Sequence, residues 1–400
     1  MNFPFFMTWQ SQKAPQSFKI KSYQGPYFVT DNDQKILDFS STSYHTSFGG
    51  TPKKIINKVK NQLEFSPMAC PKAITDQKVD VTNRLLDFLN LPEGKIYYTL
   101  SGAESVENAL KIARVLTKTS LVISRTDSYH GATLGALTAT GDWRNQANIV
   151  PGKDWSLKIP GPDQDPDASE LKNVFHEHGP KISAVILEPT SGANGVVSLT
   201  QDWVKALNEL KEKYQFTLII DEVLTGFYRL GACAPLAIHN YQGLSPDIVC
   251  LGKNISAGVI PFGAIWVKQE IFNSFLDEVL PCGSTNYAHP LGLSALDGVL
   301  ETLSEESFIN HLHRLEKDLN EGLEKLKSLN QINSIRIKGL LACIDLKFTP
   351  SWQDLINRGL YVGCVGKRLI IAPPYILQSS ELKNGIEIIQ SYIEKASYEK

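Results

Sequence analysis

A carboxylate and an amine follow two buried-type apolar runs near the middle of the chain. Residues 216–220 form a partly β-branched run that ends at Asp221, and residues 248–251 form a second run that leads into Gly252 and Lys253. Short apolar runs bounded by polar residues are typical of strands buried on both faces of a parallel sheet. The carboxyl ends of parallel strands share one edge, where open α/β sheets bind ligands. We therefore expect Asp221 and Lys253 to lie at the same edge.

A lysine beside a carboxylate at such an edge suits pyridoxal phosphate. The lysine amine forms the Schiff base, and the carboxylate keeps the pyridine nitrogen protonated, so that the ring accepts electrons from a substrate carbanion. A magnesium-binding strand of a nucleotide hydrolase would instead need a GxxxxGK[ST] loop. Asp247 stands where the first glycine of that loop would precede Gly252 and Lys253. An ordinary buried strand with solvated charges at its end remains open from these two segments alone.

Composition excludes several classes of protein. The 400 residues are 42% hydrophobic and 20% charged, which suits a globular enzyme with one large and one smaller domain. The net charge of -2 gives no basic footprint, so we expect no nucleic-acid partner and no anionic-membrane partner. No apolar run approaches the roughly 20 residues of a membrane span. The start, MNFPFFMTWQSQ, lacks the basic region of a signal peptide.

The six cysteines are scattered and include no CxxC pair. Reduced thiols in a cytoplasmic protein are the simplest explanation, and neither a disulfide framework nor a metal site is indicated.

The order of elements predicts an α/β fold. Strands alternate with helices from Ile96 to Val267, which indicates a doubly wound, mainly parallel sheet. A hairpin around residues 31–33 is expected to join a second, smaller α+β domain near the C-terminus. Further expected elements are a helix over residues 53–65, a long loop over 141–167, and helices over 306–329 and 380–396. The expected domains are residues 1–50, packing with the small domain, residues 51–285, the large cofactor-binding domain, and residues 286–400, the small C-terminal domain.

A strand, a small-residue turn and a helix begin at Ile96. Ser101 and Glu104 have the spacing of a capping box, so Ser101, Gly102 and Ala103 lie at a helix N-terminus. The free N–H groups and the dipole there favour a phosphate group. Every capped helix shares these features. This helix is a candidate phosphate site because it begins at the carboxyl end of an expected strand.

Aromatic residues provide further candidates. Tyr129 follows the apolar run 121–124 and either stacks on a planar heterocycle or packs in the core. Trp9 and Tyr44 either line a pocket or pack at a subunit contact.

Taken together, these motifs resemble the class III (ω-) aminotransferases, a subgroup of the fold type I pyridoxal phosphate enzymes. The resemblance covers nearly the whole chain. Its motifs are LSGAESVENALKIAR, DSYHGAT, ILEPTSGANG, IIDEVLTGFYRLG, PDIVCLGKNISAGVIPFGA, STNYAHPLGLSAL and IAPPYIL.

The resemblance implies roles for individual residues. Lys253 would form the Schiff base, and Asp221 would hold the pyridine nitrogen. Gly102 and Ala103, with Ser101 beside them, would bind the phosphate. The remaining implied roles are stacking of Tyr129 and Val223 on the two ring faces, contact of Thr285 with the phosphate of a neighbouring subunit, and either supporting or direct contacts for His130 and Glu188.

Departures from the family pattern concern the substrate. Many glutamate-using members carry an acidic residue where this chain has Ala193 and an arginine where it has Ile370. Leu224 replaces a glutamine of some relatives. Arg368 either anchors a distant carboxylate or is solvated. The diaminopelargonate synthases of biotin synthesis are also similar, but Gly363 stands where their substrate-binding arginine is expected.

These observations predict an aminotransferase that moves an amino group from an amine or ω-amino donor to a keto acceptor by a ping-pong mechanism, as a homodimer with shared sites. The alternatives are a diaminopelargonate-synthase-like enzyme, and an aminomutase or decarboxylase on the same fold. A pyridoxal phosphate-binding protein without activity is the least favoured.

Overall fold

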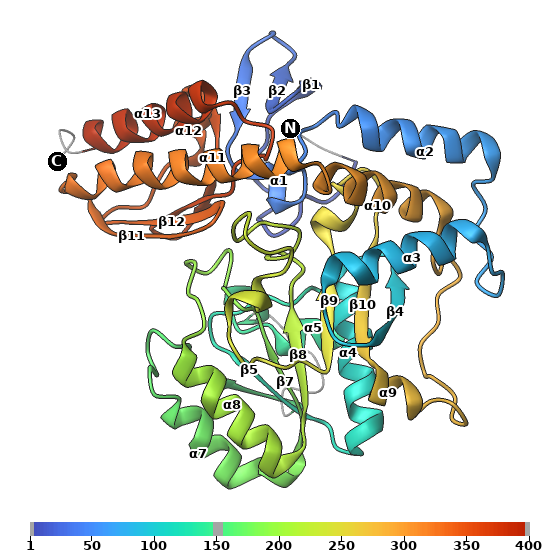
Figure 1. Cartoon of the computed structure of the whole chain (residues 1–400). Helices are drawn as coiled ribbons and strands as arrows, with labels where there is room; N and C mark the ends of the chain where they lie inside the picture. Colours follow the sequence, from blue (N-terminus) through green and yellow to red (C-terminus); the bar gives the residue numbers. More distant parts are fainter. Residues whose placement is uncertain (1–3, 147–154, 397–400) are drawn as a thin grey trace.

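The computed structural model describes residues 4–146 and 155–396 and is built around a seven-stranded sheet (Figure 1). The strand order is β4-β10-β9-β8-β7-β5-β6. Within the described part of this sheet, β10 alone runs antiparallel to its neighbours β4 and β9. This confirms the predicted mainly parallel sheet. The strands are β4 (Gly94–Thr99), β5 (Leu121–Arg125), β6 (Ser156–Ile159), β7 (Ile182–Leu187), β8 (Thr217–Asp221), β9 (Ile248–Leu251) and β10 (Gly263–Lys268).

Helices cover both faces of this sheet, as the unbroken apolar runs of its strands require. Successive residues of β7 alternate between two hydrophobic clusters: Ala184 and Ile186 lie in one, and Val185 and Leu187 lie in the other. The first cluster includes residues of α4 (Gly102–Thr117) and α5 (Leu134–Ala139), and the second includes residues of α7 (Ser169–His178) and α8 (Gln201–Tyr214). The strands are therefore held rigidly, and so are the residues at their ends.

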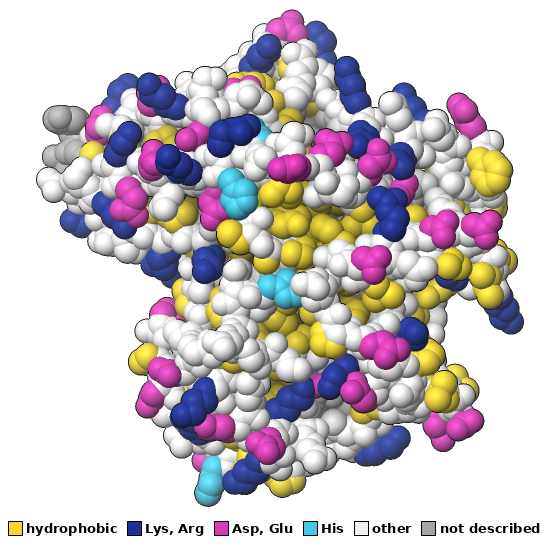
Figure 2. All heavy atoms as spheres, viewed as in Figure 1, with side chains coloured by type: hydrophobic (Ala, Val, Ile, Leu, Met, Phe, Trp, Pro, Cys, Tyr) yellow, Lys and Arg dark blue, Asp and Glu magenta, His cyan; other side chains and the backbone are white. Residues whose placement is uncertain are grey.

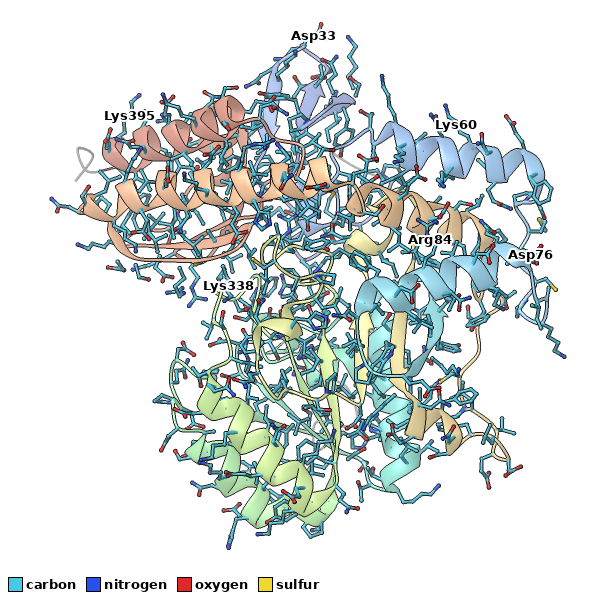
Figure 3. All side chains as sticks on the ribbon, viewed as in Figure 1. Asp33, Lys60, Asp76, Arg84, Lys338 and Lys395 are labelled. Atoms are coloured by element: carbon cyan, nitrogen blue, oxygen red, sulfur yellow. The ribbon has the colours of Figure 1, made fainter. Side chains whose placement is uncertain are left out.

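Three further helices pack beside the sheet: α2 (Lys53–Phe65), α3 (Asp76–Leu89) and α10 (Pro290–Leu303). Arg84 of α3 and Lys58 of α2 both form ion pairs with Asp297 of α10; Figure 3 labels Arg84 at this contact. The short helix α9 (Gln269–Asn273) follows β10 directly.

The C-terminal part forms a separate antiparallel sheet in the order β11-β12-β15-β14. The leucines of α11 (Glu306–Glu324) pack with the apolar face of α13 (Ser379–Lys395) over it (Figure 1). A 3-10 turn at Lys325–Ser328 ends the long helix slightly before the expected position. The other elements are β11 (Ile332–Lys338), β12 (Leu341–Leu346), α12 (Trp352–Asn357), β14 (Gly363–Val365) and β15 (Arg368–Ile371).

The N-terminal hairpin pairs with this C-terminal part. β2 (Tyr27–Thr30) and β3 (Lys35–Asp38) are antiparallel, as predicted, and Asp33 lies at the tip of the turn (Figure 3). β3 also pairs in parallel with β13 (Leu360–Tyr361), while β1 (Ile20–Gln24) extends the sheet on the other side. The segment that follows β3, with the short turn α1 (Ser41–Tyr44), thereby lies next to the C-terminal strands.

The expected loop over residues 141–167 differs from the prediction in its described parts; residues 147–154 lie outside the described ranges. α6 (Trp143–Gln146) and the edge strand β6 interrupt it. The strand β6 was not expected because it contains the charged residue Lys158. The side chain of Lys158 points inward and donates hydrogen bonds to Ser124 Oγ (2.8 Å) and to the Thr138 carbonyl (2.6 Å). In the described ranges, no helix combines the length and the hydropathy needed to span a bilayer.

Candidate active site

A cavity of about 580 Å³ opens at the carboxyl ends of the central strands. It is lined by side chains from the large sheet, the N-terminal segment and the C-terminal strands. The predicted site residues in its lining are Trp9, Tyr44, Gly102, Ala103, Tyr129, His130, Glu188, Asp221, Val223 and Lys253. Ser101, Thr285 and Arg368 lie outside the lining.

Asp221 lies at the floor of the cavity and is held by two hydrogen bonds. Its Oδ1 accepts the backbone N–H of Val223 at 3.0 Å, and its Oδ2 lies 2.8 Å from His130 Nδ1. Both side chains are almost fully buried. Among the described residues, His130 Nε2 has no hydrogen-bond partner. The carboxylate is therefore fixed in orientation and is backed by a histidine.

Lys253 follows β9, which is the strand next to β8, the strand that ends at Asp221. β8 and β9 are parallel, and Asp221 is paired with Cys250, three residues before Lys253. The backbone of Lys253 is in the left-handed region, at φ 46°, which is a strained conformation of a kind that clusters at functional sites. Its Nζ lies 5.6 Å from the centre of the Tyr44 ring, and no hydrogen bond or ion pair of this amine occurs within the described ranges.

Removal from solvent lowers the pKa of the Lys253 amine below its usual value, and the carboxylates of Asp221 and Glu188 oppose this effect. A lysine with a lowered pKa is a better nucleophile and base near neutral pH, because more of it is uncharged.

The N-terminus of α4 presents backbone N–H groups to the cavity at Gly102 and Ala103. Ser101 Oγ caps the helix by accepting the Glu104 N–H at 3.1 Å, and the Glu104 carboxylate accepts the N–H of Leu100, not that of Ser101. Ser101 therefore positions the helix end from outside the lining. A Cβ on Gly102 would lie 2.5 Å from Val223 Cγ1, so only glycine allows this close approach.

Tyr129 and Val223 both contribute side chains to the lining above Asp221. Val223 lies on the side of Gly102. Gly131 has φ 134°, and a Cβ there would lie 2.7 Å from the Cβ of Ala103, so glycine lets the tyrosine segment lie against the helix terminus.

Glu188 ties Tyr129 to the turn after β7. Its Oε1 accepts the N–H of Tyr129 at 3.1 Å and its Oε2 accepts the N–H of Gly192 at 3.3 Å. Burial raises the pKa of this carboxyl, and the charge of the nearby Asp221 acts in the same direction.

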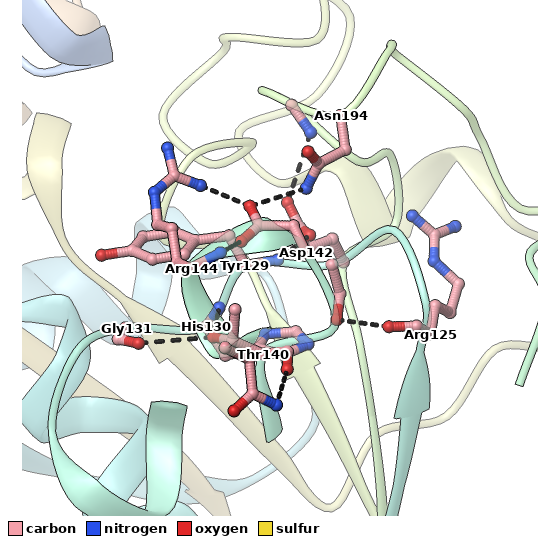
Figure 4. A network of polar contacts seen from close by, with 12 residues as sticks. Arg125, Tyr129, His130, Gly131, Thr140, Asp142, Arg144 and Asn194 are labelled. Carbon is pink, nitrogen blue, oxygen red and sulfur yellow. Dashed lines mark hydrogen bonds and ion pairs between the residues drawn. The ribbon is translucent and has the colours of Figure 1, made fainter. Parts of the chain in front are cut away.

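The mouth of the cavity contains a group that the sequence reasoning missed. Arg144 lines the cavity, and its guanidinium lies 4.4 Å from the Tyr129 ring centre and 5.5 Å from that of Trp9 (Figure 4). The signal available in the sequence was the aromatic and cationic GDWRN segment inside the expected loop. Trp9 packs edge-on against Tyr129 with the ring centres 6.3 Å apart, so an N-terminal residue reaches the site.

Of the remaining candidates, Arg368 and Thr285 lie outside the cavity lining. Arg368 donates hydrogen bonds to Asp345 Oδ1 (3.1 Å) and to the Asn194 carbonyl (3.2 Å), outside the cavity. Thr285 is exposed in the turn before α10. Ala193 and Gly363 line the cavity, whereas Ile370 is fully buried in the C-terminal core.

The donor set fits the cofactor expected from the sequence. A buried carboxylate, a lysine amine, the N-terminus of α4 and the side chains of Tyr129 and Val223 are grouped in one cavity. They match the ring nitrogen, the aldehyde, the phosphate and the ring faces of pyridoxal phosphate, respectively.

Comparison with known proteins gives a family. The family model described as Aminotransferase class-III matches residues 9–393. The omega-aminotransferase of Caulobacter vibrioides is 28% identical over 93% of this chain and 92% of that protein. The probable gamma-aminobutyrate transaminase 3, mitochondrial, of Oryza sativa subsp. indica is 26% identical over 97% of this chain and 84% of that protein.

Solved structures share the fold. The taurine:2-oxoglutarate aminotransferase of Bifidobacterium kashiwanohense, solved with PLP and glutamate, superimposes with a TM-score of 0.90 at 24% identity, covering 98% of this chain and 96% of that one. An S-selective transaminase from Arthrobacter sp., solved with alanine bound, gives a TM-score of 0.91 at 22% identity, covering 99% and 97%.

Proposed function

The chain belongs to the class III aminotransferase family and is a pyridoxal phosphate-dependent transaminase; we propose that it takes the amino group from an amine or an ω-amino acid and gives it to a keto acid by a ping-pong mechanism. The observation that supports the assignment of roles most strongly is the grouping of Lys253, Asp221 and the α4 N-terminus in one cavity. When bound, pyridoxal phosphate supplies the carbonyl that receives the amino group and a ring that acts as an electron sink.

In this proposal each residue of the site has a separate role. The Lys253 amine anchors the cofactor and then accepts the proton released from the donor carbon that carries the amino group. The Asp221 carboxylate keeps the ring nitrogen protonated, with His130 holding its Oδ2. The N–H groups of Gly102 and Ala103 bind the phosphate. Tyr129 and Val223 cover the ring faces, and Glu188 fixes Tyr129 through its backbone.

The proposed donor class follows from the absence of a charged side chain at positions 193 and 370. Ala193 contributes no charge to the lining, and Ile370 is withdrawn into the core. A substrate carboxylate next to the reacting carbon therefore has no cationic partner at these two positions. An amine whose carboxylate is absent or distant from the amino group fits better.

The subunit arrangement is also part of the proposal. Thr285 is exposed and outside the cavity of its own chain, so a role at the cofactor phosphate requires a second copy. Large hydrophobic side chains are also exposed: Leu63 and Phe65 at the end of α2, Met68 and Ile74 between α2 and α3, Val79 in α3, and Leu276 and Val279 after α9. Figure 2 shows hydrophobic side chains gathered on the face between α10 and α3. Exposed apolar surface of this kind favours a homodimer.

The test of function uses single half-reactions. The purified enzyme, loaded with pyridoxal phosphate, is mixed with one amine at a time, and the visible absorbance of the cofactor is followed. Loss of absorbance with amines, and its return with a keto acid, would establish transfer between two molecules. Loss of carbon dioxide or rearrangement within one molecule would point to a decarboxylase or an aminomutase. No response to any amine would contradict the proposed function.

A further inference from the structure

The part of the cavity lining next to Lys253 includes a strained backbone segment. Residues 40–44 follow β3, and all of them except Ser41 contribute to the lining. Ser41 and Tyr44 have positive φ angles of 45° and 67°. Thr42 has φ 61° and ψ -83°, a γ-turn conformation that is rare and strained, above all for a β-branched residue. Strain of this kind persists only where the surrounding structure holds it.

The strained segment brings an aromatic ring to the lysine. The Lys253 Nζ lies over the Tyr44 ring, 5.6 Å from its centre. The same ring packs against a hydrophobic cluster that includes Leu224 and Ile370. Tyr44 therefore covers part of the space around the amine that anchors the cofactor in the proposed function.

One carboxylate is hydrogen-bonded to this segment through both of its oxygens. Asp38 ends β3 and is almost fully buried. Its Oδ1 accepts the Ser40 N–H at 3.0 Å, and its Oδ2 accepts the Thr42 N–H at 2.7 Å. The hydroxyls of Thr42 and Thr46 lie 3.3 and 3.4 Å from the same Oδ2. Hydrogen bonds to a charged acceptor are about twice as strong as neutral ones.

The charge of Asp38 is directed to the segment. In the described ranges no ion pair of Asp38 occurs, so hydrogen bonds are what compensate for the burial of this carboxylate. The start of the segment is also fixed to the C-terminal strands: Ser40 Oγ accepts the Gly363 N–H at 2.7 Å, and Ser41 Oγ donates to the Ala372 carbonyl at 2.8 Å. Both of these anchors precede the strained turn at position 42.

We propose that Asp38 is a positioning residue: its carboxylate holds Thr42 in the strained turn and thereby places the Tyr44 ring beside the Lys253 amine. Without the carboxylate, the turn would relax and the ring would move away from the amine. The effect on the reaction rests on the proposed function, whereas the holding of the segment does not.

Hydrogen exchange tests whether Asp38 holds the segment. The enzyme loaded with pyridoxal phosphate is compared with Asp38→Asn at about pH 8, where the carboxyl is ionised because burial raises its pKa only to about 6. The amides of residues 44–46 are bonded to the carbonyls of Ser40 and Ser41, so they report opening of the segment. Exchange of residues 42–46 should be about 10- to 100-fold faster in Asp38→Asn, the range for losing a hydrogen bond to a charged group.

Asp33→Asn is the matched control. Asp33 lies at the tip of the same hairpin, also has a positive φ (61°), and pairs with Lys21 in solvent. The same substitution there should leave both the exchange of residues 42–46 and the rate of the first half-reaction within about twofold of wild type, because exposed ion pairs contribute little.

The second measurement separates positioning from general stability. The rate of the first half-reaction with saturating amine is divided by the amount of bound cofactor, so that unfolded enzyme does not affect it. Asp38→Asn should be about tenfold slower than wild type, because the surroundings of the reacting amine are displaced. Thr42→Gly relieves the strain, since glycine adopts a positive φ readily. In the Thr42→Gly background, Asp38→Asn should slow the rate by less than about threefold.

Exchange in Asp38→Asn within twofold of wild type would overturn the inference. An unchanged rate per bound cofactor, or an equal loss of rate in the two backgrounds, would do the same. If Asp38→Asn does not fold, its combination with Thr42→Gly should fold, and failure of both would also overturn the inference. A wild-type enzyme that reacts with no amine would instead count against the proposed function and would leave the exchange result intact.

Discussion

Asp221 and His130 form a buried pair with 2.8 Å between Oδ2 and Nδ1. The second carboxylate oxygen of Asp221 accepts the Val223 N–H, so neither oxygen can rotate freely. The pair joins the end of β8 to the segment after β5, two elements that only the folded sheet brings together.

This pair leads to a prediction about Asp221. Asp221→Asn should keep the fold and bind pyridoxal phosphate, because the phosphate contacts and Lys253 remain. Turnover should fall by about 100-fold or more, since a neutral amide no longer stabilises a protonated ring nitrogen. Steady-state kinetics with saturating cofactor checks this. His130→Ala should cause a smaller loss, because it removes only a support of the carboxylate. Turnover of Asp221→Asn within threefold of wild type would contradict the role.

The raised pKa of Glu222 leads to a predicted pH dependence of the protein's stability. It is fully buried beside Asp221, its Oε1 accepts the Ile238 N–H at 2.7 Å, and burial raises its pKa to about 7 from 4.5. The folded protein therefore holds this proton at pH values where the unfolded chain releases it. Its contribution to stability is full below pH 4.5 and is lost as the pH rises to about 7.

The free energy of unfolding is measured for wild type and for Glu222→Gln, and the difference between the two is followed against pH. This difference should decrease by up to about 1.4 kcal/mol per pH unit between those two values. Denaturant titrations at several pH values give the slope. A difference that stays constant over this window would show that the carboxyl is not held protonated.

Shared active sites predict complementation between two inactive variants. Lys253→Ala lacks the anchoring amine, and Thr285→Asp places a negative charge where the partner's cofactor phosphate is expected. A heterodimer of the two should contain one site with both lesions and one intact site, so activity should return to up to half of the wild-type value per dimer. Failure to recover activity in heterodimers verified by differential tags, or full activity in a monomer, would rule out shared sites.

Glutamate is expected to be a poor donor. It carries two carboxylates, and the described cavity lining offers one guanidinium, Arg144. A second carboxylate would be desolvated without a cationic partner, which is unfavourable. The half-reaction with glutamate should therefore be at least tenfold slower than that with the best ω-amino donor. A second-order rate constant for glutamate equal to that of the best donor would contradict this reading.

The sequence predicted the parts of the site whose position depends on local pattern. Apolar runs located β8 and β9, and with them Asp221 and Lys253 at one edge. The capping spacing at Ser101 and Glu104 located the start of α4, although the Glu104 carboxylate bonds to the N–H of Leu100. In each case hydrophobic periodicity or a cap fixes the element without reference to distant residues.

The parts that were missed depend on tertiary contacts. Arg144 lies in the four-residue helix α6, which is too short to show a periodic pattern. Its place in the cavity depends on its neighbours Asp142 and Trp143 and on Asn194, Tyr129 and Trp9, which come from other segments. Arg125 is likewise fully buried at the end of β5, where sequence reasoning gives no reason to bury an arginine. For Arg368 the sequence left open a carboxylate anchor or a solvated side chain, and the folded chain pairs its guanidinium with Asp345 outside the cavity.

The role of Lys253 is tested most directly by locating the covalent linkage of the cofactor. The enzyme loaded with pyridoxal phosphate is reduced with borohydride, digested and mapped by mass spectrometry, alongside Lys253→Ala. We expect a pyridoxyl group on Lys253 in wild type. In Lys253→Ala we expect no labelled peptide and no turnover, with cofactor still bound non-covalently. A pyridoxyl group on any other lysine of the wild-type enzyme would contradict this role of Lys253.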